Sequence, residues 1–201
     1  VDGAGQVWCW GSSQYGLLGP ATTADTASPV QIQGLPALAQ RVSVGYMHAC
    51  ALLQDGRIAC WGYGGYGQLG QGEFTYAPTL PVLVASDETF VQVVTGKSHT
   101  CARNDTDDVF CWGQAWRGQL GVVAGTRGMS HAAPQEVALK AIDLAAVPSA
   151  DATCALDAQA DAWCWGGNEN AQLGIGRRGV REVPGPVMGA GEDVFSDGFE
   201  P

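Results

Sequence analysis

The chain has 201 residues, of which 46% are hydrophobic and 15% charged, with a formal net charge of −10. This length and composition support a buried core and exclude a chain that is disordered throughout. The acidic balance disfavours nucleic acid as a partner, and no apolar run of about 18 residues is present to span a membrane. We expect the N-terminus to have been cut, because Val1, Asp2 and Gly3 do not begin a signal-peptide pattern.

One short motif occurs four times along the chain. The copies are CWGSSQYGLLG from Cys9, CWGYGGYGQLG from Cys60, CWGQAWRGQLG from Cys111 and CWGGNENAQLG from Cys164. Their tryptophans are separated by 51, 51 and 53 residues, at Trp10, Trp61, Trp112 and Trp165. A period near 50 is typical of propeller blades and exceeds the period of helical repeats.

Each copy overlaps a short stretch of β-favouring residues that is apolar on both faces, at 7–10, 58–61, 109–112 and 162–165. A strand covered on both faces belongs in a stack of sheets, as in the blades of a propeller. A Pro–Val segment follows each motif, and 29 glycines favour many turns. Residues 134–143 fit a helix or a strand equally well. We therefore predict an all-β propeller of four-stranded blades.

The pattern W-G-x4-G-Q-L-G is complete at 61–70 and 112–121 and degenerate at 10–19 and 165–174. Together with a G-x-x-H-T-C-A type of element at 45–51 and 96–102, it resembles the regulator of chromosome condensation repeat family. The third copy of that element, at 149–155, lacks both Gly and His. The resemblance implies a propeller, usually of seven blades, of which this chain would supply three complete blades and an incomplete one.

The predicted domain boundaries follow the repeats. The propeller domain covers 1–188, with repeat motifs at 8–19, 43–70, 92–121 and 147–174. Three arrangements stay open: part of a larger ring, an open arc that self-associates through its free edges, or a small closed propeller. Residues 189–201 form an acidic C-terminal tail, which is either a disordered end or similar to a short tail of some secreted Gram-negative bacterial proteins.

Six of the seven cysteines form pairs that are 10 residues apart around a turn. Residues equidistant from the turn of an antiparallel hairpin face each other, so we predict the disulfides Cys50–Cys60, Cys101–Cys111 and Cys154–Cys164. Cys9 is left unpaired, and its expected partner would lie before Val1. Bridges imply a secreted, periplasmic or cell-surface protein, whereas the alternative is a set of small buried thiols in a cytosolic core.

The sequence favours a protein without catalytic residues, metal or cofactor. It has no C-x-x-C spacing and no nucleophile or phosphate-cradling motif. His48 and His99 occupy equivalent positions, where Ala152 stands in the third repeat. We expect them to be hydrogen-bonded core residues; the alternative is a ligand role around a channel. We expect a solvated loop at His131. The Asp105, Asp107 and Asp108 cluster reads as a solvated turn, with calcium as the alternative.

The loops that follow each W-G pair carry aromatic and basic residues, and we expect them on one rim of the propeller. The candidate partner-binding residues are Tyr15, Tyr66, Trp116 and Arg117. Such residue types dominate protein-binding hot spots, although rings in these loops can also pack between blades. A protein partner is therefore expected, and its identity stays open.

Three functions are compatible with these observations. The first is an extracellular, non-enzymatic binding or scaffold module. The resemblance implies two alternatives, because the family includes a secreted bacterial propeller that inhibits β-lactamases and a founding member that exchanges nucleotide on a small GTPase. The acidic chain end and the hairpin cysteine pairs disfavour the exchange factor, which is intracellular and usually has a basic tail.

Overall fold

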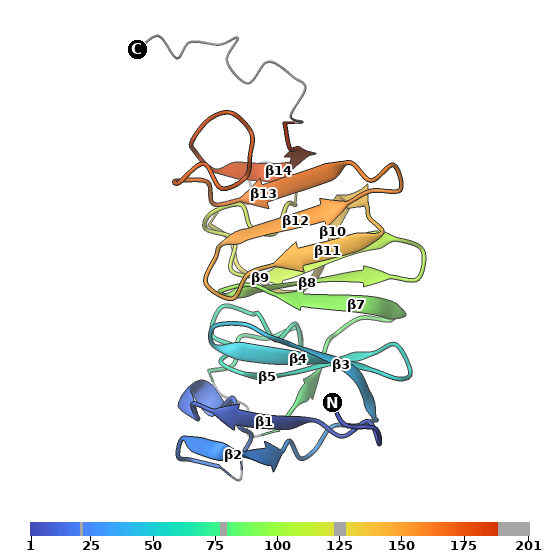
Figure 1. Ribbon diagram of the computed structural model, residues 1–201, viewed down its shortest axis with the longest axis vertical. Coiled ribbons are helices and arrows are strands. Elements are labelled where there is room, and N and C mark those ends of the chain that lie inside the picture. Colours follow the sequence, from blue (N-terminus) through green and yellow to red (C-terminus); the bar gives the residue numbers. More distant parts are fainter. Residues whose placement is uncertain (21, 77–79, 123–127, 189–201) are drawn as a thin grey trace.

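The computed structural model describes residues 1–20, 22–76, 80–122 and 128–188, and these form an all-β structure with one short 3₁₀ turn, η1 (Gln14–Gly16). The strands form one two-stranded sheet and three four-stranded sheets, all antiparallel. The sheets are stacked along the long axis of the molecule, with the first sheet at the bottom and the fourth at the top in Figure 1. Each sheet is a propeller blade, so the prediction of three complete blades and an incomplete one is confirmed.

Strand order follows chain order within every sheet. The first sheet contains β1 (Trp8–Gly11) and β2 (Thr26–Gln31). The second contains β3 (Ala39–Val44), β4 (His48–Leu53), β5 (Ile58–Gly62) and β6 (Val82–Leu83). The third contains β7 (Phe90–Thr95), β8 (His99–Asn104), β9 (Asp108–Gly113) and β10 (His131–Lys140). The fourth contains β11 (Asp143–Ala146), β12 (Ala152–Leu156), β13 (Ala162–Gly166) and β14 (Arg181–Pro186). The ambiguous residues 134–143 are thus β-structure.

The core lies between the sheets. Trp112 packs with Leu52 and Ile58 of the preceding sheet and with Leu69 of the β5–β6 loop, and Trp165 packs with residues of the third blade in the same way. The exposed fractions of Trp61, Trp112 and Trp165 are 1%, 0% and 0%. Because burial of a large aromatic side chain stabilises a fold by several kcal/mol, these three tryptophans contribute strongly to the contacts between neighbouring blades.

The register of each central hairpin places two cysteines opposite each other. The structure joins Cys50 to Cys60, Cys101 to Cys111 and Cys154 to Cys164 in disulfides. Each bridge closes a loop within a single blade. Cys9 is the free cysteine of the described residues, and burial raises the pKa of its thiol.

The glycines of the repeated motif are required by close approaches of the backbone. Gly113 has φ +103°, and a Cβ there would lie 2.7 Å from the carbonyl oxygen of Ser98. A Cβ on Gly121 would lie 2.6 Å from Nε1 of Trp165 in the next blade. The first glycine therefore forms the turn after the strand, and the second makes room for the tryptophan of the neighbouring blade.

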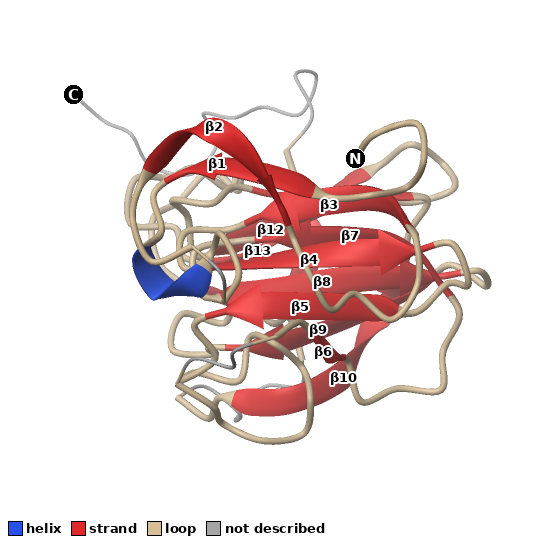
Figure 2. Cartoon of the chain, turned by 90° about the horizontal axis from the view of Figure 1, so that it is seen from below, coloured by secondary structure: helices blue, strands red, loops and turns tan. Residues whose placement is uncertain are grey.

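The stack has two distinct rims. The loops after β1, β5, β9 and β13 share one edge, which we call the W-G rim, and η1 marks it at the left of Figure 2. The β4–β5, β8–β9 and β12–β13 turns share the opposite edge, which we call the hairpin rim. Within the described residues, no helix has the length and apolar character needed to cross a membrane.

Candidate protein-binding site on the W-G rim

Five aromatic side chains form a continuous band across the W-G rim. The ring of Tyr63 lies 5.8 Å from Tyr15, 5.6 Å from Tyr66 and 5.8 Å from Tyr76, measured between ring centroids. The ring of Trp116 lies 5.4 Å from that of Tyr66. All four contacts are edge-to-face, the arrangement that aromatic quadrupoles favour. We call these residues the aromatic band; it connects the loops of the first three sheets.

The motif glutamines fix the loops that carry the band. The side-chain oxygen of Gln68 accepts a hydrogen bond of 2.9 Å from the backbone N–H of Tyr66. The side chain of Gln119 does the same for Arg117, at 2.8 Å. Both glutamines are fully buried, so each loop is held at its base while the side chains at its tip face outward. The loop segments that carry Tyr66 and Trp116 are therefore positioned before any partner arrives, which lowers the entropic cost of binding.

The band is partly open to solvent. The exposed fractions are 40% for Tyr15, 52% for Trp116 and 76% for Tyr76. Tyr63 is half-buried at the centre, and burial together with its tyrosine neighbours raises the pKa of its hydroxyl. The structure thus places Tyr15, Tyr66 and Trp116 on one rim and in one cluster, with Tyr63 connecting them, rather than packing the exposed rings between blades.

Arg117 lies at the end of the band and reaches the fourth sheet. Its guanidinium forms ion pairs with Glu169 and, at 3.7 Å, with Asp151. Two hollows meet at Arg117 and Asp151. One, of about 360 Å³, is lined by residues that include Tyr46, Tyr66, Lys97 and Trp116, and the other, of about 470 Å³, includes Glu169, Asn170 and Gln172. Arg117 and Asp151 line both hollows.

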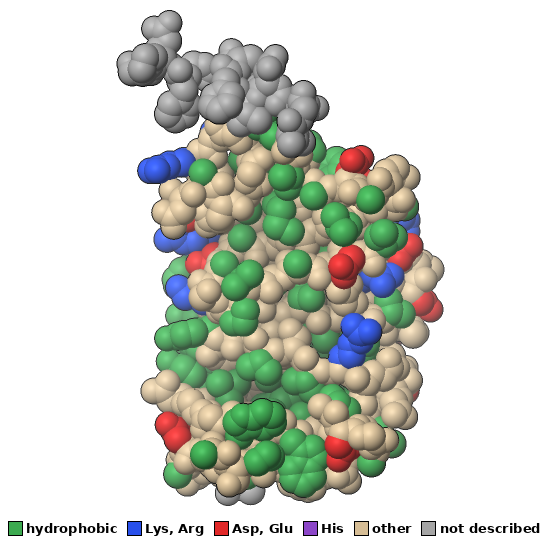
Figure 3. Space-filling view, in the orientation of Figure 1, with side chains coloured by type: hydrophobic (Ala, Val, Ile, Leu, Met, Phe, Trp, Pro, Cys, Tyr) green, Lys and Arg blue, Asp and Glu red, His purple; other side chains and the backbone are tan. Residues whose placement is uncertain are grey.

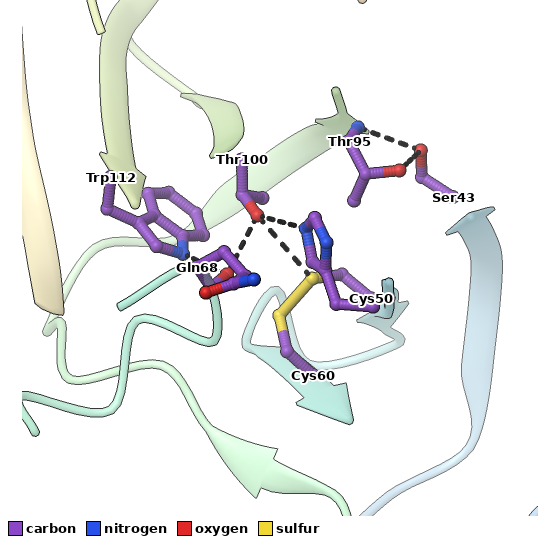
Figure 4. Close-up of a disulfide and its surroundings, with 8 residues drawn as sticks. Ser43, Cys50, Cys60, Gln68, Thr95, Thr100 and Trp112 are labelled. Atoms are coloured by element: carbon purple, nitrogen blue, oxygen red, sulfur yellow. Dashed lines mark hydrogen bonds between the residues drawn. A yellow bond between two sulfur atoms is a disulfide. The ribbon is translucent and has the colours of Figure 1, made fainter. Parts of the chain in front are cut away.

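The two equivalent histidines lie inside the stack, away from the rim surface. Nε2 of His48 lies 2.8 Å from the hydroxyl of Thr100, whose proton goes to the carbonyl of Gln68. The indole N–H of Trp112 donates to the same carbonyl at 3.0 Å (Figure 4). Because the threonine proton is already used, Nε2 of His48 must carry the proton of the neutral ring. The prediction that His48 is a hydrogen-bonded core residue is confirmed.

His99 repeats the arrangement one blade further along, with Nε2 at 2.8 Å from the hydroxyl of Thr153. Burial lowers the pKa of His99 to about 4, and burial followed by the charge of His99 lowers the pKa of His48 to about 3. Both rings are therefore neutral at physiological pH. Thr100 and Thr153 were missed in the sequence, although a threonine follows the histidine position in two of the three copies.

The structure tests two expectations from the sequence, for His131 and for the aspartate cluster at 105–108. His131 begins β10 and is half-buried, with no hydrogen bond to its Nε2 inside the described chain, so the expectation of a solvated loop histidine is wrong. Asp107 forms an ion pair with Arg103, and Asp108 forms one with Lys140. Two of the three carboxylates of this turn are therefore neutralised by basic side chains of the same chain. Within the described residues, no group of three or more potential ligands is arranged around a metal site.

The comparison with known families agrees with the repeat pattern. The regulator of chromosome condensation (RCC1) repeat model matches residues 4–52 and 55–103, and a second RCC1 repeat model matches 40–68 and 90–119. The chain belongs to the RCC1 repeat family. The aromatic band therefore lies on loops of an RCC1-repeat propeller.

The chain covers less than half of each relative described here. It is 35% identical over 180 residues to the probable E3 ubiquitin-protein ligase HERC6 of Homo sapiens, covering 87% of this chain and 17% of that protein. Human WBSCR16 has a similar structure, with a TM-score of 0.78, 21% identity, and coverage of 93% and 48%. Prp20p of Saccharomyces cerevisiae gives a TM-score of 0.79 at 19% identity, covering 92% and 47%. At these identities the two structures show the fold alone.

Proposed function

We propose that this chain is a non-enzymatic protein-binding module of an extracellular or cell-surface protein, and that it binds its partner through the aromatic band. The observation that carries the proposal is a set of five contacting rings, exposed at Trp116 and Tyr76, on loops held at their base. Tyr and Trp supply large contact areas at a low entropic cost, and they are enriched at the energetic centres of interfaces.

The proposed compartment rests on the disulfides. Three bridges of the same separation, one in each complete blade, are stable in the oxidising environment outside the cytosol. Alkylation of the native protein without reduction, followed by intact mass measurement, tests this point. We expect one free thiol per chain, that of Cys9. Seven free thiols in protein from its native compartment would overturn the extracellular assignment and leave the binding proposal standing.

An inhibitor of a secreted enzyme is the first alternative, because the same band can cover an active site. It predicts inhibition of a secreted hydrolase at micromolar concentration. Exchange of nucleotide on a small GTPase is the second, supported by the similarity to Prp20p, whose structure is described together with its binding to Gsp1p and histones. The disulfides argue against this alternative, and unchanged nucleotide release from candidate GTPases would exclude it.

Site-specific photo-crosslinking tests the binding surface. A photoreactive amino acid replaces Tyr76 on the aromatic band, and a matched variant carries it at Ala158, which is exposed on the hairpin rim. Both proteins are incubated with the extracellular fraction of the source cell. We expect a discrete crosslinked protein from position 76 alone, and its loss when Trp116→Ala is added. Equal crosslinking from both positions, or the same product in the presence of Trp116→Ala, would contradict the proposal.

A further inference from the structure

The charges on the W-G rim are unevenly distributed along the stack. The loops of the first two sheets carry the carboxylates of Asp25 and Glu73 on this rim. Among the described residues, the rim of the last two sheets carries five cations and three carboxylates, which are Lys97, Arg117, Arg177, Arg178 and Arg181 against Asp151, Glu169 and Glu182. Blue side chains are visible at the left edge of these upper sheets in Figure 3. This basic patch lies in a chain whose net charge is −10.

The basic patch is continuous with the aromatic band. A Cβ on Gly118, two residues after Trp116, would lie 2.7 Å from Cα of Glu182 and 2.9 Å from the carbonyl oxygen of Arg181. The loop that carries Trp116 therefore packs directly against the start of β14. Lys97 reaches the same place from the β7–β8 turn and lines one hollow with Tyr66 and Trp116.

The cations of the patch are only partly neutralised. Arg117 forms ion pairs with Glu169 and Asp151, whereas Lys97, Arg177 and Arg178 form none with the described part of the chain. Arg181 donates a hydrogen bond to the carbonyl of Pro186. Burial and the nearby charge of Arg177 lower the pKa of Arg181, as expected where like charges are close together. An anionic group placed here would relieve this repulsion.

We infer that the W-G rim of the last two sheets binds an acidic segment of a partner protein that also carries aromatic side chains. The inference rests on the proposed function. It adds the chemical character of the partner segment and the orientation in which that segment lies along the rim. Its aromatic groups pack on Tyr66 and Trp116, and its carboxylates pair with Lys97, Arg177 and Arg178. The acidic part lies over the fourth sheet, because Asp25 and Glu73 at the other end of the rim repel it.

One rival occupant belongs to the chain itself. Residues 189–201 contain four carboxylates and two phenylalanines, Phe195 and Phe199, and no cation. They follow the last described strand and are outside the described residues. A segment of 13 residues reaches about 44 Å when extended, which exceeds the length of about 20 Å of the 6-residue strand β14 that leads away from the rim. The experiment must therefore separate a partner from this tail.

A fluorescein-labelled peptide of sequence EDGFEDGFED tests the inference by fluorescence anisotropy with the full chain. A first control peptide has Gln and Asn in place of Glu and Asp, and a second has Ala in place of Phe. We expect both controls to bind about tenfold more weakly or worse, and binding of the acidic peptide to weaken steeply as salt is raised. The double variant Lys97→Glu/Arg178→Glu should also weaken binding of the acidic peptide about tenfold.

The matched charge control is Arg57→Glu, which reverses an exposed cation on the hairpin rim and should leave binding unchanged. Circular dichroism and the melting temperature establish that every variant is folded. Equal binding of the acidic and the Gln/Asn peptides would overturn this inference. The photo-crosslinking result at Tyr76 decides the proposed function independently of the peptides.

Deletion of residues 189–201 decides between the two occupants. If the full chain binds the acidic peptide with the same affinity as the shortened chain, the rim is free for a partner, as we infer. If binding is detected only after the deletion, the tail occupies the basic patch, and the inference of a partner segment is overturned in favour of an internal contact.

Discussion

The contact between the first and second sheets differs from the two contacts that follow it, although the same motif builds all three. In the later contacts, a histidine, a threonine, a glutamine carbonyl and a tryptophan form one buried network. In the first contact, Trp61 donates to the carbonyl of Leu17, and Ala49 occupies the place of Thr100 and Thr153. Trp10, whose sheet has no preceding sheet among the described residues, is 63% exposed, whereas Trp112 is fully buried against the second sheet. A motif residue therefore acquires its structural role from the neighbouring blade.

Replacing the motif tryptophan should give the largest difference between a tryptophan packed on a preceding sheet and Trp10, which has no preceding sheet among the described residues. Trp112→Ala leaves a large cavity between the second and third sheets, and we expect it to lower the free energy of unfolding by about 3–5 kcal/mol. Trp10→Ala removes a mostly exposed side chain and should cost less than about 1 kcal/mol. Urea unfolding followed by circular dichroism measures both variants. Similar losses would contradict the proposed role of the neighbouring blade.

Removing a disulfide should show how much a paired cysteine contributes to stability compared with the unpaired Cys9. The double variant Cys101→Ala/Cys111→Ala frees a loop of about 10 residues in the unfolded chain and should cost about 3 kcal/mol. Cys9→Ala serves as the control and should change the unfolding free energy by less than about 1 kcal/mol, because Cys9 has no bridge within the described residues. Denaturation under non-reducing conditions tests both, and equal losses would show that bridging adds nothing.

Acid should weaken the later contacts selectively. The pKa of His99 is about 4 in the folded protein and about 6.5 when unfolded, so the unfolded chain binds more protons below pH 6.5. The contribution of His99 to the free energy of unfolding is fully present above pH 6.5, and it decreases as the pH falls toward 4. Between pH 7 and 5 the loss is about 2 kcal/mol.

The variant His99→Gln should show a correspondingly smaller decrease between these two pH values, measured by urea unfolding at each. The wild-type chain also loses stability through His48 over the same range, because its folded pKa is about 3. An unchanged pH dependence in His99→Gln would mean that the ring is protonated inside the fold.

The smallest expected effect concerns one position of the W-G loops. Ala171 has φ +58°, where the second and third repeats have the glycines Gly67 and Gly118. Left-handed backbone is unfavourable for alanine, so Ala171→Gly should raise the free energy of unfolding by about 0.5–1 kcal/mol. The reverse change, Gly118→Ala, places a Cβ 2.7 Å from Cα of Glu182 and should destabilise. Thermal unfolding distinguishes them, and a destabilising Ala171→Gly would refute the strain argument.

Much of this architecture was predictable because its signals are local. The tryptophan spacing predicted the blades, and the separation of 10 residues predicted which cysteines face each other, since a hairpin depends only on nearby residues. Tyr15, Tyr66 and Trp116 were expected on one rim for the same reason. The contact of their rings through Tyr63 was not predictable, because it depends on how successive blades are rotated.

Contacts between blades leave weaker signals in the sequence than contacts within one hairpin. His48 meets Thr100, which is 52 positions away, and Arg117 meets Glu169 in the next sheet. No spacing rule within one repeat selects such pairs. His131 was misplaced because it is the first residue of β10, and the exact ends of strands leave little signal in a sequence. The basic patch was not predicted, because its five described cations come from three separate segments of an acidic chain.

The disulfides have a consequence for how repeats of this kind are copied. Each covalent bridge closes within one hairpin, whereas the histidine, threonine and tryptophan contacts extend from one repeat to the next. A duplication or loss of a whole repeat would carry every bridge with both of its halves. The noncovalent partners would be supplied again by the new neighbour. Arrays of different lengths could therefore arise by genetic recombination between repeats without producing mispaired thiols.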